Sequence, residues 1–362
     1  MRLGTCLALE LACVAAAVGG ALFGVGHAIE LADDYVLTRE AAAATRTTTY
    51  GGITRLPEAT LRVDPPAALP TVFDAPDDVL LAPLGSAAVV RVKPNRGGTS
   101  LSLRLDFANG SRAAFKPQQI HLQSEPRREI AAYRIDRLLG IGHVAPAKPA
   151  KFTVAELVAA ADPQLRSVTT QRIVGETRAR DGVVRGFIAW WIPEIRDARI
   201  GELNVDTTEG MELWTSYLRI GAKVPANARS LVEQLASLVV FDVVIDNADR
   251  WSGSNVKVSP DRTTVYFMDN TLSFSQFTKG HDNNLRPLYR MQVFPRALVA
   301  RLRALTLESL TAALDLGDDP AGMGPLLTDG ELAAVISRRD HVLAYIDRQI
   351  AQFGEDAVLA LP

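Results

Sequence analysis

Two acids and an amide lie close together in the second half of the chain. Asp249 belongs to the polar turn 246–250, Asn255 follows it by six residues, and Asp269 comes directly after the apolar run 265–268. Phosphoryl transfer needs one carboxylate to orient the attacking hydroxyl, and an amide and a second carboxylate to hold Mg²⁺ or Mn²⁺ on nucleotide phosphates. The types and spacing of these residues therefore predict metal-dependent nucleotide chemistry.

A helix and a hairpin have to position these three side chains. Ser230 and Glu233 have the spacing of a capping box, which predicts a helix over about 231–244. The turn 246–250 after this helix is too polar to be buried without a purpose. We expect two short β-like segments to follow, the second of which ends at Asp269.

The folded part is expected to begin with strands and a glycine-rich turn. A β-like run at 87–92 and a break at 93–100 precede the alternating run 101–107, the Asn109-Gly110 hairpin turn and a strand at 112–116. Kinase amino-terminal lobes share this layout, in which the backbone N–H groups of the first turn lie over phosphates. The candidate phosphate contacts are Gly97, Gly98, Thr99, Ser100 and Lys116. Taken alone, a glycine-rich turn is more often only a turn, and a lysine at a strand end is usually solvated.

The next predicted helix carries an acid that extends this pattern. Ser124-Glu125-Pro126 is a helix start with proline in the first turn, and Gly140 is a stop after the helical run 127–139. Glu129 lies in the first two turns, thirteen residues after Lys116. A strand lysine followed by a helix glutamate forms the ion pair that positions the lysine of kinases. Glu129 alone would be read as a solvated helix charge, but its place in the order of the chain favours the pair.

Several of these segments resemble one family. The chain resembles the secretory-pathway kinases of the Golgi casein kinase and four-jointed type in several short segments. These are DNADRW, the later Asn255, MDN, AAFKPQ and REIAAYRIDRLLG. They are more distantly similar to HipA-like and phosphoinositide kinases. The resemblance implies that Asp249 is the catalytic-loop acid, that Asn255 and Asp269 bind the metal, and that Lys116 contacts phosphate and pairs with Glu129.

The resemblance has three departures. Asp246 stands where the family often has glycine, and Trp251 replaces the histidine that follows the arginine. The spacing from Asp249 to Asn255 is one residue longer than in the lipid kinases.

The resemblance also implies a fold, cofactors and partners. The fold class is α+β, a two-lobed protein-kinase-like fold with an antiparallel sheet and a helix in the amino-terminal lobe (83–192) and a mostly helical carboxy-terminal lobe (193–362). The catalytic loop is 246–255. ATP with Mg²⁺ or Mn²⁺ is the expected nucleotide and metal, and a hydroxyl of a protein or glycan is the expected acceptor.

Composition excludes some other classes. The chain has 362 residues and a net charge of −2, with no lysine- or arginine-rich block, which argues against a nucleic-acid partner. Cys6 and Cys13 both lie in the amino-terminal apolar segment, so the remainder has neither a disulfide framework nor a thiolate metal site.

The segment 1–29 is predicted to be a signal peptide or a membrane anchor. Residues 3–29 are almost entirely apolar, Arg2 precedes them, and acids such as Glu30 follow them. This distribution of charge predicts that the globular part is exported. Gly26-His27-Ala28 is a passable cleavage site. The Ala-, Thr- and Pro-rich stretch 30–82 is read as a low-complexity linker.

Three other functions remain open at this stage. A pseudokinase would keep the fold and act as a binding or scaffold protein, and an AMP transferase would hold the nucleotide turned round. A metal-dependent hydrolase would use Asp246, Asp249 and Asp269, with His281 and Asp282 as the only further ligands close in sequence.

The remaining segments predict scaffold elements. Helices are expected at 154–161, 211–220 and 295–314, a strand at 168–174, and a strand leading into the hinge at 186–194. The polar stretch 282–289 is a candidate substrate-facing segment. Thr328 and Glu331 form a second capping box, which opens a helix to about Phe353.

Overall fold

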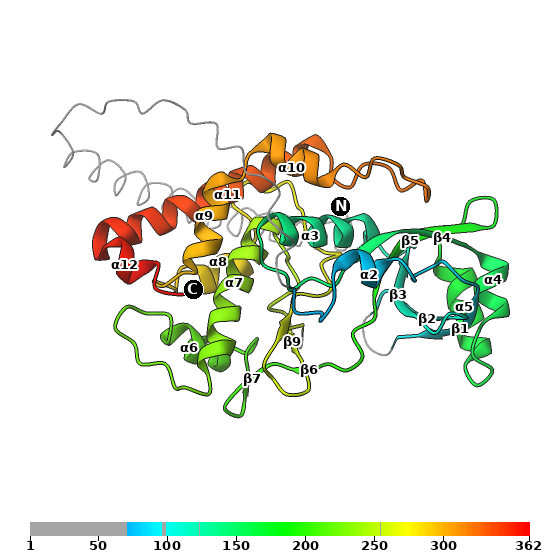
Figure 1. The fold of residues 1–362 in the computed structure, drawn as a ribbon, viewed down its shortest axis with the longest axis horizontal. Coiled ribbons are helices and arrows are strands. Elements are labelled where there is room, and N and C mark those ends of the chain that lie inside the picture. Colours follow the sequence, from blue (N-terminus) through cyan, green and yellow to red (C-terminus); the bar gives the residue numbers. More distant parts are fainter. Residues whose placement is uncertain (1–70, 96–98, 123, 254) are drawn as a thin grey trace, which may run out of the picture. The chain divides into compact units, whose positions relative to one another are not determined.

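The computed structural model describes residues 71–362, apart from 96–98, 123 and 254. These residues belong to one structural unit (Figure 1). The predicted signal or anchor segment and most of the predicted linker lie outside the described residues. No helix in the described part of the chain is long and apolar enough to span a membrane.

A five-stranded sheet, antiparallel throughout, forms one end of this unit. Its order is β1-β2-β3-β5-β4, so the chain leaves the sheet after β3 and returns at the opposite edge. The strands are β1 (Val89–Pro94), β2 (Leu103–Phe107), β3 (Arg112–Pro117), β4 (Ala147–Thr153) and β5 (Val183–Trp190). The first three strands and the Asn109-Gly110 hairpin confirm the predicted layout, with Gly110 at a φ of 82°. The edge strand β4 was not predicted.

Four helices accompany this sheet. They are α2 (Asp77–Leu81), α3 (Pro126–Leu138), α4 (Val154–Ala159) and α5 (Arg166–Glu176). The prediction of a strand at 168–174 is wrong, because this segment is the middle of α5. Its β-branched residues favour strands, but Thr169 and Ile173 are one helical turn apart and both are buried, so packing overrides propensity.

The rest of the chain is mainly helical. Its helices are α6 (Thr208–Ser216), α7 (Arg229–Ile245), α8 (Asp282–Leu288), α9 (Arg296–Ala304), α10 (Leu307–Leu314), α11 (Asp329–Phe353) and α12 (Glu355–Val358). Its short strands are β6 (Arg196–Asp197), β7 (Arg199–Ile200), β8 (Leu203–Asn204), β9 (Lys257–Val258) and β10 (Val265–Tyr266). The long helix α11 packs against α7, which is buried along its whole carboxy-terminal half (Figure 1).

Three boundaries in this region differ from the sequence prediction. The helix α7 begins at Arg229, and Ser230 does not cap it, because the Ser230 hydroxyl faces the carbonyl of Thr263 instead. The segment 282–289 is largely the helix α8. The predicted helix over 295–314 is two helices, since the chain is extended at Leu305 and Thr306 caps α10. The capping box of Thr328 and Glu331 is confirmed at the start of α11.

The described residues form two hydrophobic cores. One core joins the inner faces of β1, β2, β3 and β5 to α4 and α5, and the other gathers around α7 and α11. The buried face of α3, including Ile130 and Ile135, belongs to the second core, although α3 also contacts β4 and β5. The helix α3 therefore ties the sheet to the helical region, and Glu129 lies on it.

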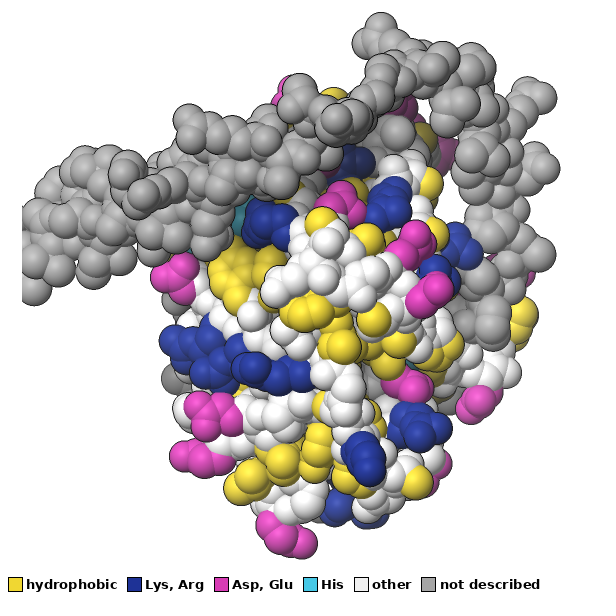
Figure 2. Space-filling model, turned by 90° about the vertical axis from the view of Figure 1, so that its left-hand side faces the viewer, with side chains coloured by type: hydrophobic (Ala, Val, Ile, Leu, Met, Phe, Trp, Pro, Cys, Tyr) yellow, Lys and Arg dark blue, Asp and Glu magenta, His cyan; other side chains and the backbone are white. Residues whose placement is uncertain are grey.

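Charged side chains of both signs are interspersed over the face seen in Figure 2, with apolar side chains between them. On the carboxy-terminal helices they form pairs, such as Arg296 with Glu355 and Arg303 with Asp347. Such exposed pairs contribute little to stability.

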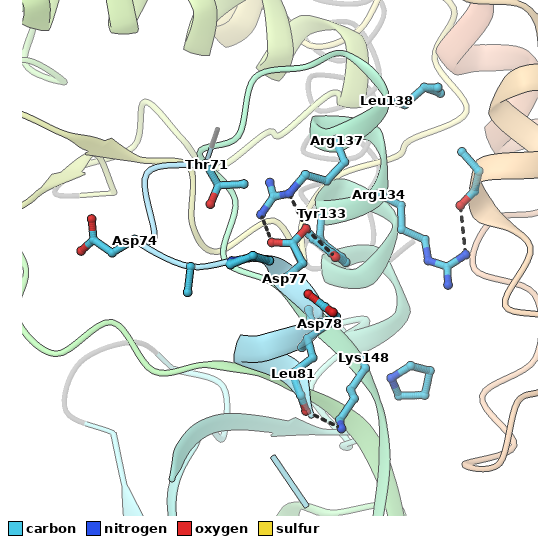
Figure 3. Close-up of a pocket in the computed structure, with 15 residues that line it drawn as sticks. Thr71, Asp74, Asp77, Asp78, Leu81, Tyr133, Arg134, Arg137, Leu138 and Lys148 are labelled. Carbon is cyan, nitrogen blue, oxygen red and sulfur yellow. Dashed lines mark hydrogen bonds and ion pairs between the residues drawn. The ribbon is translucent and has the colours of Figure 1, made fainter. Parts of the chain in front are cut away.

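A hollow of about 880 Å³ lies beside α2 and α3. Asp77 closes it on one side, where Tyr133 and Arg137 both hydrogen-bond to the Asp77 carboxylate (Figure 3). Arg134 donates to the backbone carbonyls of Ala313, in the last turn of α10, and of Asp315, directly after that helix. Lys148 donates to the carbonyl of Leu81. None of the predicted site residues lines this hollow, and its positive groups already have partners within the protein.

Candidate active site

Lys116 and Asp269 meet where the sheet faces the helical region. The Lys116 ammonium lies 2.9 Å from Asp269 Oδ1 and 3.2 Å from the Thr271 hydroxyl. Lys116 is buried at the end of β3, whereas the Asp269 side chain is 53% exposed although much protein surrounds it. Desolvation would raise the pKa of Asp269, but it is incomplete at an open carboxylate. The charge of Lys116, with hydrogen bonds from Lys116 and Thr271, holds this pKa below its usual value.

The predicted ion pair between Lys116 and Glu129 is absent from this structure, in which both residues are described. The Glu129 carboxylate instead accepts hydrogen bonds from the backbone N–H of Asn270 at 2.6 Å and from its side-chain amide at 3.2 Å. Burial raises the pKa of Glu129 to about 7, the charge of Asp269 adds to the rise, and Lys116 opposes it. Glu129 therefore holds the backbone next to Asp269, while Lys116 takes Asp269 itself as its partner.

Arg250 is a buried centre that connects the pieces of the site. Its Nε lies 3.0 Å from Asp242 on α7, and its Nη2 donates to Asn270 Oδ1 at 2.8 Å. Its Nη1 donates to the backbone carbonyls of both Asn255 and Met268. One guanidinium thus brings the two predicted metal-binding segments side by side.

This centre is a buried ion pair with a full set of partners. Burial raises the pKa of Asp242 to about 6, and the charge of Arg250 opposes that rise. Asn247 completes the set by donating to Asn270 Oδ1 and to the carbonyl of Asp269, both at 3.2 Å. Removing one member would leave charged or polar groups buried without partners, which is strongly destabilising.

Asp249 lies in the turn that these contacts hold. Its carboxylate is half-buried and accepts hydrogen bonds from the Ser252 hydroxyl and, at 3.0 Å, from the Asn255 amide. The Asn255 backbone N–H donates to Asp206 at 3.2 Å. The structure therefore brings the predicted acid and amide into direct contact.

The side chain of Asp246, three residues before Asp249, is not accessible to solvent. Asp246 ends α7 in a left-handed conformation, with φ 55° and ψ 57°, and it is fully buried. Its carboxylate accepts hydrogen bonds from Ser275, from the backbone and ring of His281, and from Asn284. These contacts use both oxygens, so Asp246 anchors the segment leading to α8. No group of three or more His, Cys, Asp or Glu side chains suited to a metal occurs among the described residues.

The glycine-rich turn joins β1 to β2 as predicted. Gly97 and Gly98 lie outside the described residues. Thr99 and Ser100 are described, and the base of the turn is closed by Asn95, whose backbone and side chain bond to Ser102 at 2.8 Å each. Neither Thr99 nor Ser100 hydrogen-bonds to Lys116, so their contact with phosphate stays a prediction.

Comparison with known proteins finds a family model that matches part of the chain. A family model described as Golgi casein kinase, C-terminal, Fam20 matches residues 211–358, which include the turn with Asp249 and Asn255 and the segment with Asp269. This part of the chain is therefore similar to the kinases of that family.

Relatives of this family extend the match beyond the helical region. A human glycosaminoglycan xylosylkinase is 26% identical over 319 residues, which cover 76% of each chain. Human extracellular serine/threonine protein kinase FAM20C is 20% identical over 331 residues, covering 78% of this chain and 56% of that protein. Among solved structures, the Golgi casein kinase has a TM-score of 0.61 at 18% identity, covering 78% of this chain and 79% of that chain. The described fold is therefore kinase-like.

The residues present fit a divalent metal such as Mg²⁺ or Mn²⁺. Asn255 Oδ1 and Asp269 Oδ2 are oxygen ligands, the type that Mg²⁺ and Mn²⁺ prefer, and neither accepts a hydrogen bond from a described residue. Asp269 also has a φ of 58°. A left-handed aspartate is uncommon and costs free energy, as is typical of functional sites.

Sequence reasoning missed the residues that hold the site together. Arg250, Asn247 and Asn270 lie within the motifs but have no role assigned from the sequence, and Asp242 lies within the helix predicted over 231–244. A signal was available, because Asp242 and Arg250 are charged residues within otherwise apolar or catalytic segments and need buried partners. Arg250 bonds to Asp242, 8 residues earlier, and to Asn270, 20 residues later, and only the folded chain identifies these partners.

Proposed function

We propose that this chain transfers the γ-phosphoryl group of ATP to a sugar hydroxyl, outside the cytoplasm. One observation carries the proposal: the half-exposed Asp249 contacts Asn255, and Arg250 joins that loop to the segment of Asp269 and its partner Lys116. These are the parts that phosphoryl transfer requires, in one place. A sugar acceptor is supported by the xylosylkinase relatives, from human and from Danio rerio, which are 26% and 25% identical to this chain.

The step needs little covalent help from the protein. The acceptor oxygen forms a bond to the γ-phosphorus while the bond from that phosphorus to the bridging oxygen breaks, and the nucleoside diphosphate leaves. Asp249 accepts or orients the hydroxyl proton, which then passes to solvent. Ser252 and Asn255 hold the Asp249 carboxylate in place for this role.

Lys116, Asn255 and Asp269 have the task of holding the nucleotide. Asn255 and Asp269 would hold the divalent metal, which supplies positive charge against the phosphate oxygens. Lys116 is the phosphate contact, and Asp269 keeps it at the site until a nucleotide is present. Glu129 fixes the backbone of Asn270 and so the position of Asp269.

The proposal is tested by incubating residues 71–362, or the full chain, with γ-labelled ATP and Mn²⁺ in the presence of simple glycosides. Label on a sugar, with release of ADP in equal amount, is the expected result. Nucleotide binding without any transfer would favour a pseudokinase, and transfer of AMP would show that the nucleotide is turned round.

A protein acceptor is the second candidate. It is favoured by the similarity to FAM20C, named as a serine/threonine protein kinase, at the lower identity of 20%. Label on serine residues of added protein, with none on glycosides, would replace the first proposal by this one.

Export and the division into lobes are also proposals. Arg2 and the apolar segment 3–29 favour a globular part outside the cytoplasm. The five-stranded sheet, whose strands all lie within 83–192, and the mainly helical chain after it favour lobes over 83–192 and 193–362. A reporter fused to the carboxy terminus, active only in one compartment, tests the location. Activity confined to the cytoplasm would overturn export.

A further inference from the structure

A second, smaller hollow borders the catalytic loop. Its volume is about 70 Å³, and it is lined by Asp206, Thr208, Met211, Trp251, Asn283, Arg286 and Arg290. Asp206 accepts the backbone hydrogen bond of Asn255, and Trp251 lies two residues after Asp249. None of the described residues that line it is a predicted nucleotide contact. The hollow therefore lies beside the loop that carries Asp249 and Asn255.

Two buried donors at this hollow have no partner in the described protein. The indole N–H of Trp251 makes no hydrogen bond, although Trp251 is only 9% exposed. Nη1 of Arg290 is also buried without a partner, while its Nη2 lies 3.6 Å from Glu212. Leaving such donors unpaired costs free energy, so a bound group that accepts hydrogen bonds from them would recover that cost.

The ring of Trp251 is held in place from behind. It stacks on Trp214 with ring centroids 5.7 Å apart and an interplanar angle of 28°. Trp214 is fully buried and its own indole N–H donates to the carbonyl of Val205 at 2.9 Å. The Trp251 N–H is therefore a fixed donor and not a mobile surface group.

The lining is matched to a particular chemistry. Arg286 and Arg290 supply guanidinium groups, which bind planar carboxylates well, and Asn283 and Thr208 can bond to neighbouring hydroxyls. The carboxylate of Asp206 would accept from a hydroxyl and would repel a purely acidic ligand. A volume of about 70 Å³ is below the size of a complete ligand pocket, so the hollow takes one edge of a larger acceptor.

We propose that this hollow is an acceptor subsite for an acidic sugar, in which Arg290 and Trp251 bind the carboxylate of a uronic acid and Asp206 and Thr208 bind its hydroxyls. The inference rests on the proposed function and makes it more specific, since it names the sugar that the kinase prefers. A polar subsite of this kind also orients the acceptor, because its buried donors are satisfied only when the carboxylate is in place.

The test compares two probes that differ at one carbon: methyl β-glucuronide, with a carboxylate, and methyl β-glucoside, with a hydroxymethyl group. Binding is measured by ligand-observed NMR titration of the whole chain. We expect the glucuronide to bind about 10-fold or more tightly than the glucoside, the scale of one charge-assisted hydrogen bond. Equal affinity for the two probes would overturn the proposal.

Substitutions locate the effect. Arg290→Gln should abolish the preference for the glucuronide, and Trp251→Phe, which keeps a ring but removes the N–H, should reduce it several-fold. Arg303→Gln is the matched control, because Arg303 pairs with Asp347 on α9 and α11 and does not line the hollow. A preference that survives Arg290→Gln would show that another site binds the glucuronide.

A third probe separates sugar from peptide, and a separate assay isolates the reaction. If N-acetylglutamate amide binds as tightly as the glucuronide, the hollow recognises acidic groups in general and the sugar assignment is wrong. Transfer of labelled phosphate from ATP is measured independently. Failure of transfer with the glucuronide preference intact would overturn the proposed function alone, and the reverse result would overturn the subsite alone.

Discussion

Asp246 and Asp249 are the same residue type, three positions apart in one turn, yet the fold gives them opposite situations. Asp246 is fully buried, and four hydrogen bonds from Ser275, His281 and Asn284 occupy its two oxygens. Asp249 is half-buried and bonds only to side chains of its own loop, Ser252 and Asn255. Asp246 is therefore a structural anchor, because it is buried and both of its oxygens accept hydrogen bonds. Asp249 is accessible and can take part in chemistry.

The difference shows that a sequence motif does not determine which of its acids is accessible and which is buried. Both acids could serve the hydrolase considered from the sequence, which needed Asp246 and His281 as metal ligands. In the structure His281 does approach Asp246, at 2.8 Å, but as one of several donors that fill a buried carboxylate. Asp249 and Asp269, the other acids of the hydrolase hypothesis, therefore lack Asp246 as a further metal ligand.

The largest expected effect concerns the accessible acid. Asp249→Asn keeps the size of the side chain but loses the charge that accepts or orients the proton, so turnover should fall about 100-fold or more. Affinity for nucleotide and metal, measured by calorimetry, should stay within a few-fold of wild type. The exposed Asp261→Asn is the control. Transfer at the wild-type rate would show that Asp249 is not the catalytic acid.

Asp269→Ala comes next and acts on nucleotide binding. It removes the proposed metal ligand and the partner of Lys116, so the gain in ATP affinity that Mn²⁺ provides should fall about 10-fold or more. Calorimetry with and without Mn²⁺ measures this gain in both proteins. Equal dependence on metal in wild type and variant would contradict the assignment of Asp269.

The buried acid should affect stability instead. Asp246→Asn keeps the shape but places an amide against donors, so the free energy of unfolding should fall by about 1–3 kcal/mol, or a few degrees in Tm. Asp181→Asn is a matched control, because Asp181 has a similar φ of 53° but is exposed. Catalysis by folded Asp246→Asn should stay near wild type, and a loss as large as that of Asp249→Asn would erase the contrast.

The smallest effect is the pH dependence of that stability difference. Desolvation alone would raise the pKa of Asp246, but hydrogen bonds from Ser275 and His281 and the charge of Arg338 hold it below the usual value. A lowered pKa in the folded state stabilises the protein above about pH 4, and this contribution is lost as the pH falls through the folded-state pKa. The stability gap between wild type and Asp246→Asn should therefore be constant near neutral pH and shrink below about pH 4. A gap that widens in acid would reverse the sign and contradict this explanation.

The sequence by itself determined the parts that depend on local order. Alternation in 101–107, the Asn109-Gly110 turn and the Thr328–Glu331 capping box specify strands and helix ends through neighbouring residues, and the structure has them. Residue type and spacing also selected Asp249 and Asp269 as candidate residues, because phosphoryl transfer needs carboxylates for the hydroxyl and the metal, and the kinase-like layout of the strands selected Lys116.

Tertiary structure decided which groups meet. Lys116 pairs with Asp269 and not with Glu129. The number of residues between Lys116 and each of these acids does not tell which of them the folded chain brings close to it. Packing made a helix of 166–176 and buried Asp246 beside an accessible Asp249. The positions of Arg250 and Asn270 follow from contacts across the fold, because a buried charge takes whatever partner the folded chain brings to it, and one sequence does not record those distances.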